Sequence, residues 1–321
     1  MVYRVLKIVV RLAMKIFCRK IIVNNRAMLG KGGPLLLASN HPNSFLDAII
    51  LDILFQKPIW SLARGDVFRN EFISKILKAL KMFPVYRVSE GVENLNSNYE
   101  TFENCKKLFR DQGIVLIFSE GKCVNEWRLR PIKKGTARLA MNSWEENIPL
   151  EVLPIGINYS SFRRFGKNVM INFGNILSEK DIPGTESEGI RYQLFNNMLQ
   201  QQLNSLVYEI NKDNKEQQQL LLEKQPSRFE RFMFAIPAAI GWLLHVPLYV
   251  PLQTIIYKKT VTNDHYDSLM AAVLLFTYPF YLFLISYLTF YFTQSFYSFL
   301  LLLLLPLTAW CYVQVKGQLD C

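Results

Sequence analysis

The sequence predicts an α/β fold: a domain with a layered mixed sheet that follows an N-terminal amphipathic helix and precedes a C-terminal helical membrane region. Between residues 26 and 178, short apolar runs alternate with segments of helical spacing, as in layered sheet-and-helix domains. Basic side chains recur at helical spacing before residue 26, and no charged side chain occurs between residues 268 and 315. The length of 321 residues suits about two folding units.

Composition excludes several classes of protein. Half of the residues are hydrophobic, which excludes a mainly disordered chain. The five cysteines and three histidines show no metal-ligand spacing, so we expect neither a metal site nor a disulfide framework. The net charge of +11 would suit nucleic acid. However, no zinc-finger, cold-shock or RNP-type motif accompanies it, and we expect no nucleic-acid partner.

The first 25 residues predict a basic amphipathic helix. Five cations spaced by three or four positions share one face of this helix: Arg4, Lys7, Arg11, Lys15 and Arg19. Such a helix can lie on an anionic membrane surface with its apolar side among the acyl chains, although a surface helix of a soluble domain has the same pattern. Because basic residues interrupt every apolar stretch, we expect no signal peptide.

Residues 26–178 predict the α/β domain itself. Gly, Pro, Asn or Asp bound five apolar runs that we expect to be strands, at residues 35–38, 59–63, 114–118, 152–157 and 169–173. Three segments between them have helical spacing, at residues 48–55, 72–80 and 136–144. The next segment, 179–230, is rich in Gln, Asn and Glu, with Leu at intervals. We expect it to be one long amphipathic helix that connects the domain to the membrane region.

Residues 231–321 predict a membrane region. The uncharged stretch 268–315 is long enough for a hairpin of two helices, each able to cross a hydrocarbon core about 30 Å thick, with a turn near residues 293–295. The segment 232–256 is also uncharged but contains three prolines, so it is either a kinked span or a pair of short interfacial helices. If it does not cross, all flanking Lys and Arg stay on the cytoplasmic side. The positive-inside rule favours that arrangement, and we expect it.

A histidine and an aspartate follow the first predicted strand. His41 lies on the loop after this strand, and Asp47 lies near the start of the next predicted helix. Histidine titrates near neutral pH and can take a proton from an alcohol, while a nearby carboxylate fixes its tautomer and stabilises the imidazolium. Ser44 and Asp47 also fit a capping-box pattern, so Asp47 has a structural alternative role.

Further charged residues follow two other apolar runs. Glu120, Gly121 and Lys122 come directly after the run at 114–118, and Arg87 follows Pro84-Val85-Tyr86. Lys and Arg can hold a phosphate or the phosphates of coenzyme A, and a basic stretch continues at Arg128, Arg130, Lys133, Lys134 and Arg138. Each of these cations also fits a solvated surface position.

Together these residues resemble the glycerolipid acyltransferases of the 1-acylglycerol-3-phosphate (lysophosphatidic acid) and glycerol-3-phosphate type. Four sequence blocks of that family occur in order over residues 35–157. The family's N-H-x-x-x-x-D, G-x-x-P-[VI]-x-R, F-P-E-G-[TK]-R/S and V-x-P-[VI]-x-I correspond to NHPNSFLD at 40–47, KMFPVYR at 81–87, FSEGKC at 118–123 and VLPIGI at 152–157. Three departures occur. His41 and Asp47 are one residue further apart, Lys81 replaces a glycine, and the third block lacks its proline and its final arginine or serine.

The resemblance implies acyl transfer from acyl-CoA or acyl carrier protein to a hydroxyl of glycerol phosphate or a lysophospholipid, most simply lysophosphatidic acid, in phospholipid synthesis. His41 is the expected base, and Asp47 orients it. The other matched positions are expected to bind substrates: Arg87 and Lys122 the acceptor phosphate, Glu120 and Gly121 the acceptor pocket, and Pro154 the acyl region. No metal or redox cofactor is implied.

The basic N-terminal helix and the C-terminal hairpin predict a multi-pass membrane protein whose catalytic domain faces the cytoplasm, in a bacterial inner membrane or, in a eukaryote, the endoplasmic reticulum. Two alternatives stay open. The protein can be an acyltransferase for a non-phosphate lipid, for example one with an amino-acid headgroup, or a non-catalytic lipid-binding membrane protein.

Overall fold

The computed structural model describes residues 2–86, 96–183 and 186–319. One sheet of seven strands, in the order β1-β7-β6-β2-β5-β3-β4, forms the centre of the domain. The strands are β1 (Cys18–Val23), β2 (Leu35–Ser39), β3 (Ile59–Arg64), β4 (Met82–Val85), β5 (Ile114–Phe118), β6 (Glu151–Tyr159) and β7 (Lys167–Phe173). All neighbours are parallel except β6 and β7, which are antiparallel. The predicted α/β fold with a mixed sheet is confirmed.

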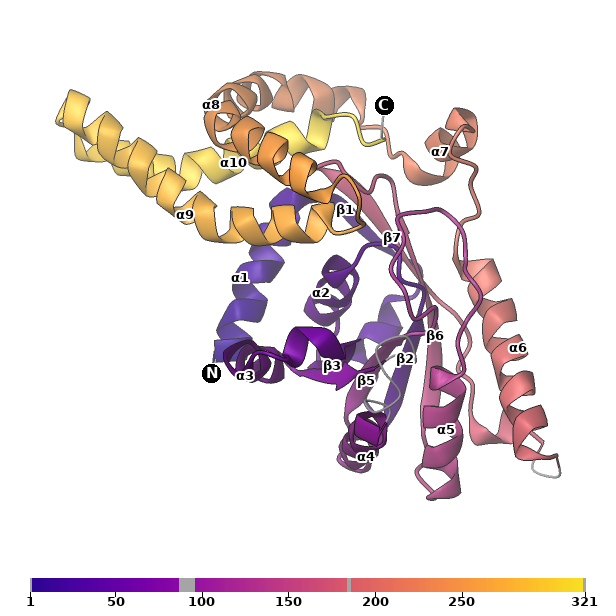
Figure 1. Cartoon of the computed structure of the whole chain (residues 1–321). Helices are drawn as coiled ribbons and strands as arrows, with labels where there is room; N and C mark the ends of the chain where they lie inside the picture. Colours follow the sequence, from indigo (N-terminus) through magenta and orange to yellow (C-terminus); the bar gives the residue numbers. More distant parts are fainter. Residues whose placement is uncertain (1, 87–95, 184–185, 320–321) are drawn as a thin grey trace.

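Helices cover both faces of this sheet (Figure 1). Leu35 and Leu37 of β2 pack in one apolar cluster, whereas Leu36 and Ala38 pack in the other, because successive side chains of a strand point to opposite faces. Burial on both sides explains why β2 is a continuous apolar run. The first cluster includes residues of α1 (Val2–Phe17) and α2 (Phe45–Leu54); the second includes residues of α4 (Asn96–Arg110), α5 (Gly135–Glu145) and α6 (Glu188–Leu206).

The N-terminal helix is shorter than the sequence predicts. It ends at Phe17, and the β-branched residues that follow form the edge strand β1, which pairs with β7. Part of the predicted basic face contacts protein: Lys7 Nζ and Arg11 Nε each donate, over 3.0 Å, to carbonyls in the last turn of α2. Arg19 is buried in β1 and donates to the Gln314 carbonyl over 2.9 Å.

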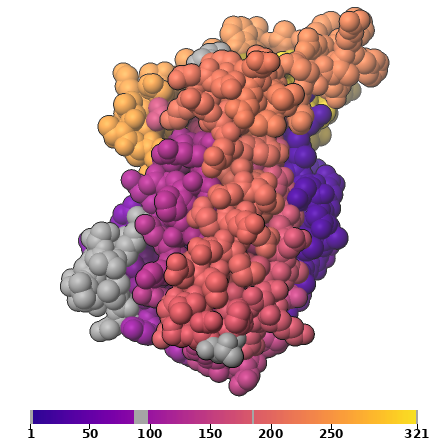
Figure 2. Space-filling model, turned by 90° about the vertical axis from the view of Figure 1, so that its right-hand side faces the viewer, coloured from indigo at the N-terminus to yellow at the C-terminus, as the bar shows by residue number. Residues whose placement is uncertain are grey.

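The connector also differs from its prediction. Residues 179–230 do not form one helix, because α6 ends at Leu206 and α7 (Lys215–Leu222) begins after an extended segment. Val207 and Ile210 in that segment are buried, and the Ile210 amide donates to the Trp127 carbonyl over 2.9 Å. Tertiary contacts therefore interrupt the helical spacing. In Figure 2 this part of the chain runs along the surface of the domain toward the membrane region.

The membrane region contains α8 (Arg228–Thr260), α9 (Tyr266–Thr293), the short helix η6 (Phe296–Leu300) and α10 (Leu301–Val315). By length and composition, three helical stretches are able to cross a membrane: Arg228–Thr260, Tyr266–Thr293 and Phe296–Val315. Both ends of α8 lie against the domain, and the helix curves between them (Figure 1). Prolines at 237, 247 and 251 account for a curved helix, because each removes a backbone hydrogen bond. By contrast, α9 projects away from the domain, and η6 and α10 return to it.

Candidate active site

His41 and Asp47 lie side by side at the carboxyl edge of the sheet. The distance between His41 Nδ1 and Asp47 Oδ2 is 2.8 Å. The His41 side chain is 18 % exposed, whereas that of Asp47 is fully buried. Because an ionised carboxylate only accepts hydrogen bonds, Nδ1 carries the proton and the lone pair is on Nε2. This is the arrangement of a histidine that can take up a proton.

The backbone of the 42–46 loop accommodates the extra residue between the two side chains. Ser44 has a φ of 54°, in the left-handed region that non-glycine residues seldom adopt. The Asn43 amide donates to Asp47 Oδ2 over 2.8 Å, while the Ser44 amide donates to Cys123 Sγ over 2.9 Å. Ser44 makes no side-chain cap, so the alternative capping-box interpretation is wrong. Asp47 instead accepts from His41, from the loop and from Tyr159, whose hydroxyl lies 2.8 Å from Oδ1.

Two residues at the end of β5 hold the His41 ring and backbone. The Phe118 ring stacks on the imidazole, with centroids 3.8 Å apart and planes inclined by 8°. The Glu120 carboxylate bridges two backbone amides, those of His41 and Arg130, each over 2.8 Å. Burial raises the pKa of Glu120, although the two amide donors oppose this effect. Glu120 thus ties the His41 loop to the loop after β5.

A cleft of about 1620 Å³ opens beside His41. Apolar side chains line one part of it: Phe45, Leu62, Met82, Val85 and Phe102. Cations line another part, near the start of α5: Arg130, Lys133, Lys134 and Arg138. Lys122 is an exposed residue at the same cleft. The cleft therefore combines an apolar wall, a basic wall and a histidine–aspartate pair.

Two backbone positions in the matched blocks adopt left-handed conformations. Gly121 has a φ of 67°, which glycine adopts without strain, and an added Cβ would lie 3.2 Å from Lys133 Cγ. Lys81 has a φ of 62°, the same conformation at the position where the family pattern has glycine. The Lys81 ammonium lies 4.6 Å from the centroid of the Trp60 ring, a cation–π contact that compensates in part for backbone strain.

Other predicted site residues are not placed beside His41. Pro154 is buried in β6 beside β2 and is not among the residues that line the cleft, so its assignment to an acyl-binding wall is not supported. The sequence block around it was apolar because β6 is a central strand. Arg87 lies outside the described residues, while its neighbour Tyr86 lines the cleft.

Sequence reasoning missed several residues at this site. Tyr159 and Cys123 contact the His41–Asp47 loop directly, and the turn at 262–265 contributes a further part of the cleft wall. Tyr159 lies two residues after the strand predicted at 152–157 and ends the observed strand β6, which is parallel to β2. The carboxyl ends of parallel strands meet at one edge of a sheet, and this rule would have placed Tyr159 near His41. Nothing in the sequence of the membrane region indicated a role for residues 262–265.

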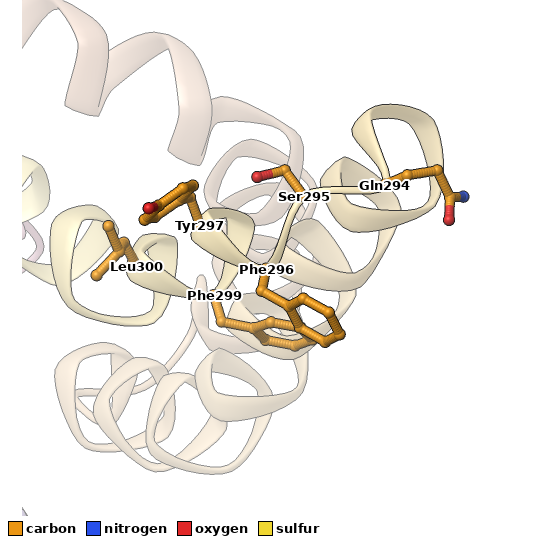
Figure 3. Close-up of a pocket in the computed structure, with 6 residues that line it drawn as sticks. All are labelled: Gln294, Ser295, Phe296, Tyr297, Phe299 and Leu300. Carbon is orange, nitrogen blue, oxygen red and sulfur yellow. The ribbon is translucent and has the colours of Figure 1, made fainter.

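A second hollow lies far from this cleft, at the turn between α9 and α10. Six residues line it: Gln294, Ser295, Phe296, Tyr297, Phe299 and Leu300 (Figure 3). It lies at the tip of the helical arm and contains no charged side chain. We therefore assign the chemistry to the cleft beside His41.

A family model matches the part of the chain that contains the four sequence blocks. Residues 20–158 match the model of the family described as Acyltransferase. This part of the chain is similar to the acyltransferase family. This match includes all four blocks that resemble the acyltransferases, and it ends one residue before Tyr159.

One similar solved structure is the crystal structure of the 1-acyl-sn-glycerophosphate (LPA) acyltransferase PlsC from Thermotoga maritima. It is 14 % identical in sequence, with a TM-score of 0.40, and the similarity covers 61 % of this chain and 79 % of that chain. No curated protein matches the sequence significantly.

Proposed function

We propose that this acyltransferase transfers an acyl chain from acyl-CoA or acyl carrier protein to a hydroxyl of glycerol phosphate or a lysophospholipid, with lysophosphatidic acid as the first candidate. The observation that carries the proposal is the 2.8 Å contact between His41 and Asp47 at the wall of a large cleft with both apolar and basic sides. Such a cleft suits two substrates that each combine an acyl chain with phosphate groups.

In the proposed mechanism, His41 acts as the general base. Nε2 takes the proton of the acceptor hydroxyl as its oxygen attacks the thioester carbonyl. The tetrahedral intermediate then expels the thiolate, which recovers the proton from the imidazolium. Asp47 holds the ring in the required tautomer and stabilises the imidazolium while it exists. The acceptor itself is the nucleophile, so no acyl-enzyme intermediate is needed.

The cations of the cleft support a role in phosphate binding. Lys133 and Lys134 lie at the start of α5, where the helix dipole also favours an anion. We assign Arg87, with Lys122, to the acceptor phosphate, because the matched block places Arg87 directly after the cleft residue Tyr86. The apolar residues around Val85 and Phe102, rather than Pro154, are the proposed acyl-binding wall.

We further propose that α9 and α10 form a membrane-inserted hairpin and that α8 stays on the domain side of the bilayer. Four residues before α8, the Lys224 carbonyl accepts from Arg19, and at the end of α8 the Thr260 carbonyl accepts from Arg163 over 3.3 Å. Along its length α9 exposes large aromatic side chains, including Phe276, Phe280 and Phe292. An exposed apolar surface of this kind is stabilised by contact with lipid rather than with water. The positive-inside rule then places the domain on the cytoplasmic face.

Two helices of the domain present apolar surfaces on the side from which α9 projects (Figure 1). On α1 these are Val5, Ile8, Val9 and Leu12, and on α3 (Glu71–Ala79) they are Phe72, Ile73 and Ile76. None of the residues of α3 is buried, although its sequence is amphipathic. We propose that both helices rest on the bilayer surface, so that a lipid acceptor reaches the cleft from the leaflet.

Incubation of the full chain in nanodiscs with labelled acyl-CoA or acyl carrier protein tests the function. The acceptors are glycerol 3-phosphate, lysophosphatidic acid and a lysolipid with an amino-acid headgroup, and mass spectrometry identifies the products. The His41→Ala variant is expected to give no product while inserting normally into the membrane. Product formation at the wild-type rate by this variant would remove the proposed base.

A variant at Arg87 tests the phosphate assignment. Arg87→Ala is expected to raise KM for a phosphate-bearing acceptor more than KM for the acyl donor, because binding of one phosphate is lost in both ground and transition states. Arg128→Ala is the matched control, since Arg128 is exposed, pairs with Glu126 and does not line the cleft. An unchanged acceptor KM in Arg87→Ala contradicts the assignment.

One observation favours a second acceptor class. The carboxylates of Asp264 and Glu188 line the same cleft as the cations, and they would attract an ammonium group. A lipid with an amino-acid headgroup is therefore the second candidate acceptor. Transfer to that lipid, without transfer to either phosphate acceptor, would identify it as the substrate.

A further inference from the structure

The turn between α8 and α9 contacts the loop that carries the histidine–aspartate pair. Residues 262–265 of this turn line the cleft, more than 100 residues beyond the end of the family match. We propose that this turn and the first turn of α9 position the His41 loop, with His265 as the principal positioning residue. The inference rests on the proposed function for its effect on catalysis, but the contacts themselves do not depend on that function.

His265 contacts Ser44, the residue of the loop with a positive φ. The distance between His265 Nδ1 and Ser44 Oγ is 2.7 Å. Ser44 is the residue with a φ of 54°, so the backbone conformation that brings Asp47 toward His41 needs support from outside the loop. His265 is itself exposed. Its side chain is joined to the domain by the described contact with Ser44.

Asp267 binds the side chain of Asn43, the residue before Ser44. Asp267 Oδ2 accepts from Asn43 Nδ2 over 2.6 Å, and the same carboxylate pairs with Lys167 of β7. All three side chains are buried. The backbone amide of Asn43 in turn donates to Asp47 Oδ2. A chain of hydrogen bonds and one ion pair therefore connects β7, through Asp267 of α9, to the carboxylate beside His41.

Backbone contacts complete the attachment. The Leu46 amide donates to Ser268 Oγ over 3.2 Å, at the start of α2. From the other side, Asn125 joins the turn to the loop: its amide donates to Asp264 Oδ1 over 3.2 Å, and its Nδ2 donates to the Pro42 carbonyl over 2.7 Å. Four residues of the loop therefore have contacts that lead to the membrane region: Pro42, Asn43, Ser44 and Leu46.

The consequence is a catalytic loop whose geometry depends on α9. If His265 no longer contacts Ser44, the loop samples conformations in which Asp47 and His41 are misaligned. The loss falls on the chemical step, because no described hydrogen bond joins Ser44 or His265 to the cations that line the cleft. Binding of the acyl donor is left largely intact.

His265→Ala in the full chain tests this inference. We expect kcat to fall about tenfold, the effect of losing one well-placed hydrogen bond. KM for the acyl donor should change less than about twofold, and His265→Asn, which keeps a hydrogen-bonding atom at the δ position, should recover kcat to within about threefold. Ser44→Ala should match His265→Ala, and the double variant should be no slower than the slower single variant, because both remove the same contact. Val261→Ala, exposed in the same turn and outside the cleft lining, is the control.

Hydrogen exchange supplies a readout that does not need activity. In His265→Ala, the amides of residues 43–46 should exchange about five to ten times faster than in the wild type, while those of β2 stay unchanged. Wild-type kcat and wild-type exchange in His265→Ala would overturn the inference, even if His41→Ala is inactive and the proposed function stands. Lower kcat with unchanged exchange would also overturn it, since His265 would then act on substrate. If the wild type transfers acyl groups to no acceptor but exchange is faster in the variant, the proposed function fails and the positioning role stands.

Discussion

Replacement of Asp47 by Asn removes the charge beside His41 while keeping the size of the side chain. The fully buried carboxylate accepts from three donors, namely His41, the Asn43 amide and the Tyr159 hydroxyl. An amide has one acceptor oxygen and one donor group. If its NH2 faces His41, two donors meet and the ring moves its proton to Nε2, which can no longer act as a base. If its oxygen faces His41, the tautomer is kept but the imidazolium has no counter-charge.

The expected loss of kcat is similar in both orientations of the new amide. With opposite charge centres about 4 Å apart and an effective dielectric constant near 20, the attraction between a carboxylate and an imidazolium is about 4 kcal/mol. At about 1.4 kcal/mol for each factor of ten, its loss lowers kcat about a thousandfold. The wrong tautomer, by analogy with catalytic triads, costs about as much or more. We therefore expect Asp47→Asn to lower kcat about a thousandfold.

The assay is single-turnover acyl transfer by the purified full chain, with thermal unfolding measured in parallel. Asp52→Asn is the matched control: Asp52 lies on the same helix, accepts from Tyr3 and from the Ile59 amide, and does not line the cleft. This control should lose stability comparable to that lost by Asp47→Asn but keep its kcat. If Asp47→Asn retains kcat within about tenfold of the wild type, the carboxylate is not acting on His41 and the reasoning is refuted.

Three further predictions concern the cleft and the membrane surface. Because burial raises the pKa of Glu120, the folded state binds the proton of this carboxyl more tightly than the unfolded state does. The free energy of unfolding therefore falls as pH rises above the ordinary carboxyl value of about 4.3. Glu120→Gln should remove this decrease, which is measured as the change in Tm between pH 4 and 7. Gly121 has a φ of 67°, and an added Cβ would lie 3.2 Å from Lys133 Cγ. Gly121→Ala should therefore lower the Tm measured by calorimetry by about 2–4 °C. A fluorophore on Phe72→Cys in α3 should be quenched by lipid-borne quenchers, whereas the same label on Leu220→Cys in α7, equally exposed, should not.

Most of the sheet could be predicted from the sequence, because strands that are buried on both faces leave continuous apolar runs. The five predicted strands are confirmed as β2, β3, β5, β6 and β7. The strand β1 was missed because its Lys and Arg continue the basic spacing of α1, and edge pairing with β7 overrides that local pattern. The break between α6 and α7 was missed for a similar reason, since the burial of Ile210 is a tertiary effect.

The site was predictable where its residues follow strands. His41 and Glu120 each come just after a predicted strand, and parallel strands bring their carboxyl ends to one edge. Pro154 was assigned to the acyl region on the family resemblance, but its block forms the central strand β6, where an apolar run is explained by burial. The contacts of Ser44 and Asn43 with His265 and Asp267 join residues more than 220 positions apart, and no local pattern encodes them.

The position of the cleft at the carboxyl edge fits the proposed function, in which one site receives one substrate from water and one from lipid. The loops after β2, β3 and β5 meet there, and the start of α9 meets them from the membrane side. In the proposed mechanism, a soluble acyl donor enters from water along the basic wall, while a lipid acceptor reaches His41 from the leaflet that α1 and α3 contact. Because α9 contacts the loop that carries His41, the proposed membrane hairpin and the alignment of His41 with Asp47 depend on the same helix. An enzyme built in this way is expected to reach full kcat only when α9 is held in its native position.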